Sequence, residues 1–157
     1  MKVITPKDDL NNLQDEDVKI FLAGGMHSPW RAELISKLED LPNLVIIDPS
    51  LDDWEKEVGE QSADNPKFVK QTDWEHQGLE ASDFQIFYFD PSTIAPISLL
   101  ELGLFKTNGT MLCVKDGYEK SGYIYYMSRR FGLPIESSTT ALAALIHLRY
   151  YSLAKIV

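Results

Sequence analysis

Five short apolar runs alternate along the chain with segments whose apolar residues have helical spacing. We expect strands at residues 18–23, 43–48, 84–89, 110–115 and 133–135, because each run is nearly continuous and is bounded by turn-forming residues. The segments between them predict helices that begin near residues 29, 66, 97, 121 and 138, several at a proline or a serine suited to a first turn. The pattern therefore predicts five units of strand followed by helix.

Strict alternation of this kind favours a parallel sheet, because each right-handed crossover lays a helix across one face. We expect an α/β, doubly wound, flavodoxin-like fold with a five-stranded sheet in the order 2-1-3-4-5 and helices on both faces. Residues 1–17 are polar and acidic and are expected to form a loosely ordered lead-in, and residues 18–157 a single domain. Ligands of such sheets bind beyond the carboxyl ends of the strands, where Gly24, Gly25, Asp48 and Asp90 stand.

Composition and charge narrow the range of partners. Hydrophobic residues make up 44% of the 157 residues and charged residues 25%, which is typical of a soluble globular domain. The net charge of −9 would repel nucleic acid polymers and acidic membrane surfaces, so a small-molecule partner is expected. No apolar run approaches the roughly 18 residues of a membrane span, and the start of the chain lacks the apolar stretch of a signal peptide, so we expect a cytoplasmic protein.

Metals and cofactors are not expected from the residues that could bind them. The single cysteine, Cys113, excludes an internal disulfide and a cysteine-based zinc site, and its apolar neighbours predict a buried strand position. The three histidines, His27, His76 and His147, lack the spacing of metal ligands. We therefore expect no metal and no cofactor.

The segment from Asp90 to Gly103 carries the strongest candidate for chemistry. It leads from a strand into a helix and places Glu101 within the first or second turn, among aliphatic residues. A carboxylate in such surroundings is costly to bury without a partner or a function. A structural role at the helix start, accepting hydrogen bonds from free amides, explains the same residue.

Other candidates each have two readings. Gly24 and Gly25 allow a ligand to approach the backbone closely, or they simply form a tight turn. Trp74 could stack on a base or pack in the core. Trp54 could belong to a lid formed by the long polar stretch from 50 to 65, or it could simply make a hydrophobic contact at the surface. Asp90 could bind sugar hydroxyls, although an Asp-Pro turn also accounts for it.

Three motifs together resemble the nucleoside 2-deoxyribosyltransferase-like family, over about residues 18–140. They are Ile20–Gly25, then Gln71–Glu75 followed by Leu79–Asp83, and Pro96–Gly103. The resemblance implies that Glu101 is the nucleophile, which displaces the base and holds the sugar as a glycosyl ester. It also implies that Asp83 contacts the base and assists proton transfer, whereas the residue by itself indicates a solvent-exposed loop acid. A carboxylate near a departing base can stabilise the cationic sugar and then trap it, as in retaining glycosidases.

The sequence departs from the family at two positions. The resemblance places Phe21 where well-known transferases of the family carry a tyrosine, so another group must orient the nucleophile. Ala95 stands six residues before Glu101, where related enzymes have Asp or Ser, and Ser98, with Ser92 and Thr93, could supply hydroxyl groups instead. By resemblance we also expect a homo-oligomer, for which the last helix, with Leu142, Leu145, Ile146 and Tyr150, offers a surface.

Three functions remain open from the sequence. The first is an enzyme that cleaves a (deoxy)nucleoside or nucleotide and transfers the sugar to another base. The second is an N-glycosidase with water as the acceptor. The third is a nucleotide-binding or signalling module without catalysis. The substrates expected for the enzymes are a nucleoside or nucleotide and, for transfer, a free nucleobase, so the chain could serve nucleoside salvage.

Overall fold

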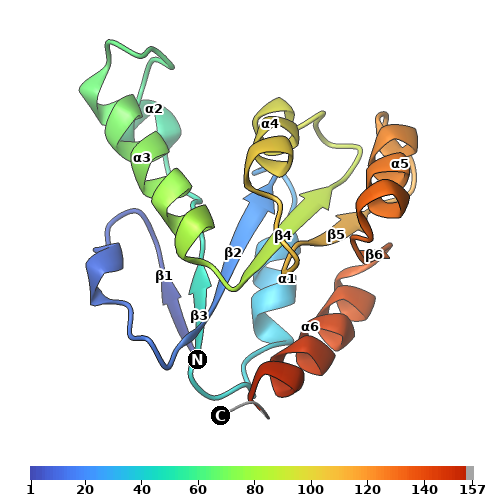
Figure 1. Ribbon diagram of the computed structural model, residues 1–157. Helices are drawn as coiled ribbons and strands as arrows, with labels where there is room; N and C mark the ends of the chain where they lie inside the picture. Colours follow the sequence, from blue (N-terminus) through green and yellow to red (C-terminus); the bar gives the residue numbers. More distant parts are fainter. Residues whose placement is uncertain (155–157) are drawn as a thin grey trace.

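The computed structural model describes residues 1–154, and their strands form one parallel sheet (Figure 1). Within these residues the strands are β1 (Lys2–Ile4), β2 (Val18–Gly24), β3 (Leu44–Ile47), β4 (Phe84–Phe89), β5 (Met111–Val114) and β6 (Ile135–Glu136). Their order across the sheet is β1-β3-β2-β4-β5-β6, and every neighbouring pair is parallel. The α/β class and the parallel sheet are confirmed.

The sheet has six strands, not the five expected, because the N-terminal segment contributes one. β1 lies at the edge beside β3, with Val3 opposite Ile46, and Ile4 is buried. The rest of the segment contains a short 3-10 helix, η1 (Leu10–Asn12). Residues 1–17 are thus not merely a loosely ordered lead-in. The other five strands have the relative order that the sequence predicts.

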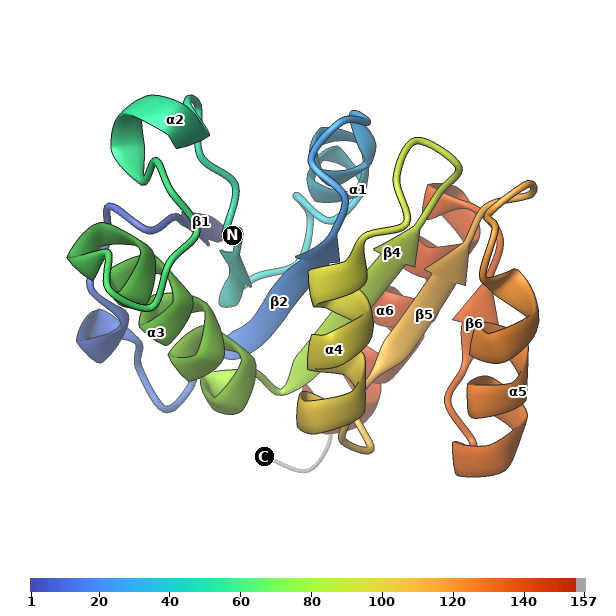
Figure 2. The same ribbon diagram turned by 90° about the horizontal axis from the view of Figure 1, so that it is seen from above.

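Two layers of helices cover the sheet (Figure 2). The helices are α1 (Trp30–Ser36), α2 (Trp54–Glu57), α3 (Pro66–Ala81), α4 (Pro96–Phe105), α5 (Ser121–Phe131) and α6 (Thr139–Ala154). Apolar residues of α1 and α6 pack on one face, and residues of α3, α4 and α5 pack on the other. None of the helices in this part of the chain is long and apolar enough to cross a membrane.

The last helix is occupied within its own chain. Leu142, Ile146 and Tyr150 of α6 are buried in the core on the α1 face, and Leu145 packs against the same cluster. They are therefore not free to form the subunit contact that we expected of them.

Two local features shape the carboxyl edge of the sheet. Ala95 has the left-handed backbone conformation (φ 48°), so the chain turns sharply before Pro96 starts α4 above the end of β4. The stretch from 50 to 65, expected as loop, contains the one-turn helix α2, which Asp53 caps by accepting a hydrogen bond from the amide of Lys56.

Candidate active site

A pocket of about 470 Å³ opens at the carboxyl ends of β2 and β4. Its walls come from the end of β2 and the loop after it, from α1, from the segment that contains α2, from α3, and from residues 93–101 at the start of α4. In Figure 1 this is the upper end of the sheet, toward which the strand arrows of β2 and β4 point. The pocket lies where doubly wound sheets bind their ligands.

Glu101 lines this pocket from the second turn of α4. The helix turns Ser98, Glu101 and Leu102 inward, and Glu101 is only 6% exposed. The described residues give its carboxylate no hydrogen-bond donor, so the explanation as a helix-start cap does not hold. Burial raises the pKa of Glu101 to about 8; the charge of Glu75 adds to this rise and that of Arg31 opposes it.

Glu75 is a second acid in the same pocket and comes from α3. Its Oε1 accepts a hydrogen bond from Nε2 of Gln71, one turn earlier, at 2.7 Å. Burial raises the pKa of Glu75, although the Gln71 bond and the charge of Arg31 oppose the rise. The charge of Glu75 raises the pKa of Glu101, so the two carboxyl groups do not readily ionise together and the pair favours holding one proton.

Arg31 brings a buried positive charge to the pocket from α1. It is 7% exposed, and its two terminal nitrogens donate to the carbonyls of Gly25 (2.8 Å), Gly24 (2.9 Å) and Leu22 (3.3 Å). Its Nε lies 3.2 Å from Oδ1 of Asp48, which is close enough for a charge contact although the angle does not suit a hydrogen bond. The guanidinium therefore touches the loop after β2 and the end of β3.

The structure gathers four of the expected binding residues around Glu101. Phe21, Gly24, Gly25 and Ser98 all line the pocket. The ring of Phe21 carries no polar group, and Ser98 is buried beside the nucleophile candidate on the same helix.

The two glycines are required by the geometry of the turn. Gly24 has φ +154°, and a Cβ there would lie 2.6 Å from the carbonyl oxygen of Tyr88. A Cβ on Gly25 would overlap Cγ2 of Thr93. The backbone of the loop after β2 therefore packs directly against a side chain of the loop after β4.

Asp48 and Asp90 stand beside the pocket and hold its walls. Asp48 pairs with Arg31 and accepts a hydrogen bond from the amide of Ser50. Asp90 accepts from the hydroxyls of Ser28 and Ser92, which join the loops after β2 and β4. Burial raises the pKa of Asp90, but these hydroxyl bonds outweigh it and leave the pKa below its ordinary value. Neither acid is among the residues that line the pocket.

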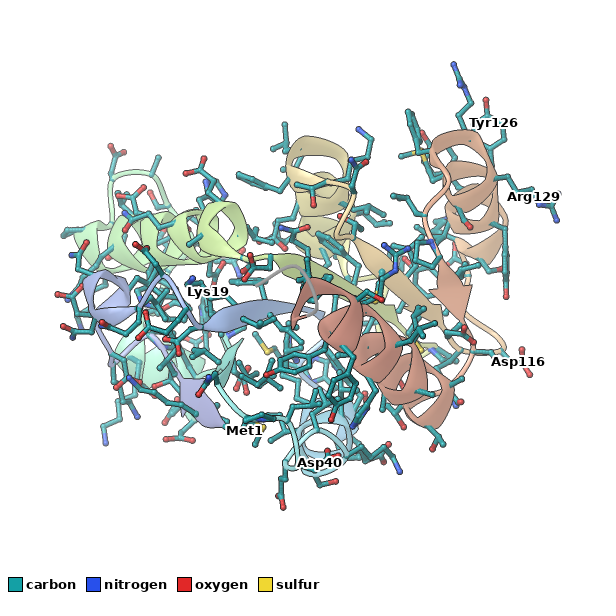
Figure 3. The ribbon with its side chains drawn as sticks, turned by 60° about the horizontal axis from the view of Figure 1, so that its bottom comes forward. Met1, Lys19, Asp40, Asp116, Tyr126 and Arg129 are labelled. Atoms are coloured by element: carbon teal, nitrogen blue, oxygen red, sulfur yellow. The ribbon has the colours of Figure 1, made fainter. Side chains whose placement is uncertain are left out.

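Asp83 and Trp74 lie away from the pocket, contrary to expectation. Asp83 precedes β4, so it stands at the amino edge of the sheet, where its carboxylate accepts the amide of Lys19 at 2.8 Å. Figure 3 labels Lys19 near the start of β2. Parallel strands all begin at the edge opposite the site, so an acid before a strand cannot reach a ligand beyond strand ends. Trp74 donates its indole N–H to the carbonyl of Asp8 and packs partly on the core.

Three residues that line the pocket were not predicted from the sequence as catalytic or binding residues. Arg31 follows Trp30 in an otherwise apolar part of α1. An arginine in such surroundings is the feature of the sequence that could have indicated a buried charge. Glu75 stands in the Gln71–Glu75 motif, four residues after Gln71 on the same helix face. Trp54, weighed as a lid residue, does line the pocket, and its indole N–H donates to the carbonyl of Gly59.

No group of three or more metal-binding side chains is gathered at one place among residues 1–154. The polar side chains of the pocket are instead suited to acid–base and nucleophilic chemistry, with two carboxyls and one guanidinium in a largely apolar cavity.

The sequence and the fold resemble known proteins. The model of a family described as nucleoside 2-deoxyribosyltransferase like matches residues 17–118. A solved structure, described as a conserved protein from Enterococcus faecalis V583, superposes with a TM-score of 0.55. It is 16% identical and covers 85% of this chain and 99% of its own, so this likeness concerns the fold. No curated protein matches the sequence.

Proposed function

The chain belongs to the nucleoside 2-deoxyribosyltransferase-like family, and from that membership we propose that it cleaves the N-glycosidic bond of a (deoxy)nucleoside or nucleotide. The sugar passes to a second base through a covalent ester on Glu101. The observation that carries the proposal is Glu101 itself, a buried carboxylate that opens onto a pocket and has a second acid beside it.

In the first step, ionised Glu101 attacks the anomeric carbon while the bond to the base breaks. A C–O ester bond forms, the C–N electron pair leaves with the base, and the charge that develops on the sugar is stabilised by the carboxylate. An anionic base is a poor leaving group, so it needs a proton or a hydrogen bond.

We assign the role of proton donor to Glu75, in place of Asp83, for which the family resemblance suggested it. Glu75 lines the same pocket as Glu101, and the pair favours a single proton. In the empty pocket the shared proton rests on Glu101, whose pKa is about 8, so the reactive form is the one in which that proton has moved to Glu75. Ionised Glu101 then attacks, and neutral Glu75 donates to the departing base. In the second step an incoming base attacks the anomeric carbon, the C–O bond to Glu101 breaks with its electron pair returning to the carboxylate, and the proton of the new base returns to Glu75.

Hydrolysis is the second candidate, because the pocket mouth is open to solvent. Met26, which lines the pocket, is 49% exposed, and His27 beside it is also exposed. Water that reaches the glycosyl ester would replace the second base as the acceptor.

The test is to incubate the protein with nucleosides and nucleoside monophosphates, with and without a free base. Base release followed by a new nucleoside indicates transfer, and release of free sugar indicates hydrolysis. Glu101→Gln abolishes both and removes the sugar adduct seen by intact mass, whereas Glu80→Gln, an exposed glutamate of α3, changes neither. A ligand that binds without turnover or adduct, in both the wild type and the Glu101→Gln variant, would instead indicate a binding module.

Glu75→Gln sharpens the assignment of the proton. Release of an ordinary base slows, because no acid protonates it, while a base that leaves readily as an anion is released at nearly the wild-type rate. Glu101→Gln shows no such recovery. Equal slowing of both substrates in Glu75→Gln would contradict its role as the acid.

For the homo-oligomer we propose the outer face of α4 as the contact, with a second copy of this chain as its partner. Ile97, Leu100 and Leu104 are 55%, 60% and 65% exposed and follow one another along that face. Gly103 lies between the leucines in sequence and has open space at its Cβ position, which lets another helix approach closely. Ile97 also lines the pocket, so a second copy here extends the pocket wall.

A further inference from the structure

Two side chains of α1, Arg31 and Trp30, hold the end of β2 and the loop after it. The carbonyls of Leu22, Gly24 and Gly25 all accept hydrogen bonds from Arg31, and the indole N–H of Trp30 donates to the carbonyl of Gly25 as well, at 3.0 Å. The guanidinium lies 4.5 Å from the centre of the Trp30 ring. Because the donors of a guanidinium are rigid and planar, these bonds fix the shape of the turn rather than only its position.

Three acids lie near Arg31, each from a different element. Asp48 approaches from the end of β3, Glu75 from α3 and Glu101 from α4, and each attracts the positive charge of Arg31. Among the residues that line the pocket, all of them in the described part of the chain, Arg31 is the only Arg or Lys. Burial alone would favour a neutral guanidinium, and the three acids counter it.

We propose that Arg31 is a positioning residue with two linked tasks: it holds the Gly24–Gly25 turn against the substrate, and its charge keeps one carboxyl of the Glu75–Glu101 pair ionised. The inference rests on the proposed function for its meaning in catalysis, but the electrostatic task is measurable without turnover. Without the guanidinium both carboxyls would be protonated in a pocket this buried, and no nucleophile would be present.

Two replacements separate the tasks. Arg31→Lys keeps the charge but loses the planar set of donors, so the turn loosens while the acids still face a cation. Arg31→Gln loses the charge and most of the donors. Neither replacement is expected to touch the reacting atoms, because the terminal nitrogens of Arg31 donate to backbone carbonyls and its Nε lies beside Asp48.

The experiment follows the carboxyl carbon of Glu101 by NMR as pH is varied, in protein labelled with carbon-13 at the glutamate carboxyls. The signal is assigned by its absence in Glu101→Gln. Arg31→Gln raises the pKa of Glu101 by about one pH unit or more, the size expected from losing a close opposite charge. Arg31→Lys leaves it within a few tenths of the wild-type value.

Steady-state kinetics also separate the positioning task of Arg31 from its electrostatic task. Arg31→Lys raises KM about tenfold, the loss of one charged hydrogen bond, and leaves the pH profile in place. Arg31→Gln also shifts the acid side of the kcat/KM profile to higher pH, in step with the pKa of Glu101. A replacement that merely weakened the fold would lower activity without moving that profile.

A folded Arg31→Gln variant with an unchanged Glu101 pKa overturns the proposal, whatever the activity of the wild type. If that variant does not fold, Asp48→Asn decides, because it keeps Arg31 and removes the acid that neutralises it most closely. The freed charge then lowers the pKa of Glu101, and a pKa that stays the same or rises overturns the proposal. An absence of base release with the expected pKa changes would count against the proposed function alone.

Discussion

Glu101→Gln should make the fold more stable at alkaline pH while abolishing any nucleophilic role. The folded protein raises the pKa of Glu101 from the ordinary 4.5 to about 8, chiefly by burial. The folded state therefore binds this proton more tightly than the unfolded chain does. Stability falls as pH rises from about 4.5 through 8, because ionising the buried carboxyl costs more than ionising an exposed one. Glutamine has nearly the same shape and never ionises.

The size of the effect follows from that pKa. A rise from 4.5 to about 8 corresponds to about 5 kcal/mol at roughly 1.36 kcal/mol per pH unit. The side chain faces an open pocket, and the glutamine amide needs hydrogen-bond partners of its own, so we expect a gain of about 3 kcal/mol at pH 9. For a domain of 157 residues this raises Tm by about 9 °C.

The assay is urea denaturation of the wild type and the variant at pH 4 and at pH 9, with Tm measured alongside. The two proteins have similar stability at pH 4, where the carboxyl is protonated in both states. Glu80→Gln is the control, since it removes the same charge from an exposed position of α3 and should change stability little at either pH.

A Glu101→Gln variant that is no more stable than the wild type at pH 9 would refute the reasoning, because the carboxyl would then ionise in the folded protein without cost. An equal gain at both pH values would also refute it, since the benefit would come from packing. The expected outcome is a trade-off between stability and activity: the site keeps a buried carboxyl group for its chemistry although that group destabilises the fold.

Three further changes test the geometry of the site. Gly25→Ala forces a methyl group against Thr93, so base release falls at least about tenfold while the fold survives, as circular dichroism would show. Asp83→Asn weakens the bond to the amide of Lys19 and costs about 1 kcal/mol in urea denaturation, but base release stays at the wild-type rate; a loss of catalysis would place Asp83 in the site after all. Leu100→Lys puts a charge on the outer face of α4 and is expected to convert the proposed oligomer to a monomer in light scattering, whereas a mass equal to that of the wild type contradicts the proposed contact.

The sequence predicted the strands of the sheet centre and missed the edge strand. The run from Phe84 to Phe89 is apolar at nearly every position, which only a strand buried on both faces explains, and all six residues are buried. β1 has three residues, and its strand conformation depends on pairing with β3 rather than on any pattern of its own. The one-turn helix α2 escaped prediction for the same reason, since four residues carry no periodicity.

The position of Asp83 away from the pocket could have been predicted from the sequence. A resemblance suggested its role, but the residue precedes a strand, and in a parallel sheet every strand begins at the edge away from the ligand. Glu101 follows the same strand and so could be placed correctly at the site. The direction of the strands, already predicted, would have favoured Glu75 or another residue over Asp83.

The sequence by itself determined the alternating architecture, the edge of the sheet at which the pocket opens, and Glu101 as a candidate acid at that edge, because periodicity and strand ends are local properties of the chain. Only the tertiary structure decided that Glu75 and Arg31 lie near Glu101, that one face of α6 packs in the core, and that the outer face of α4 leaves apolar residues exposed. The pKa of a carboxyl depends on the charges and the solvent around it, and here these come from α1 and α3, 70 and 26 residues earlier in the chain (Glu101 against Arg31 and Glu75). Such contacts between residues far apart in the sequence cannot be predicted from a local sequence pattern.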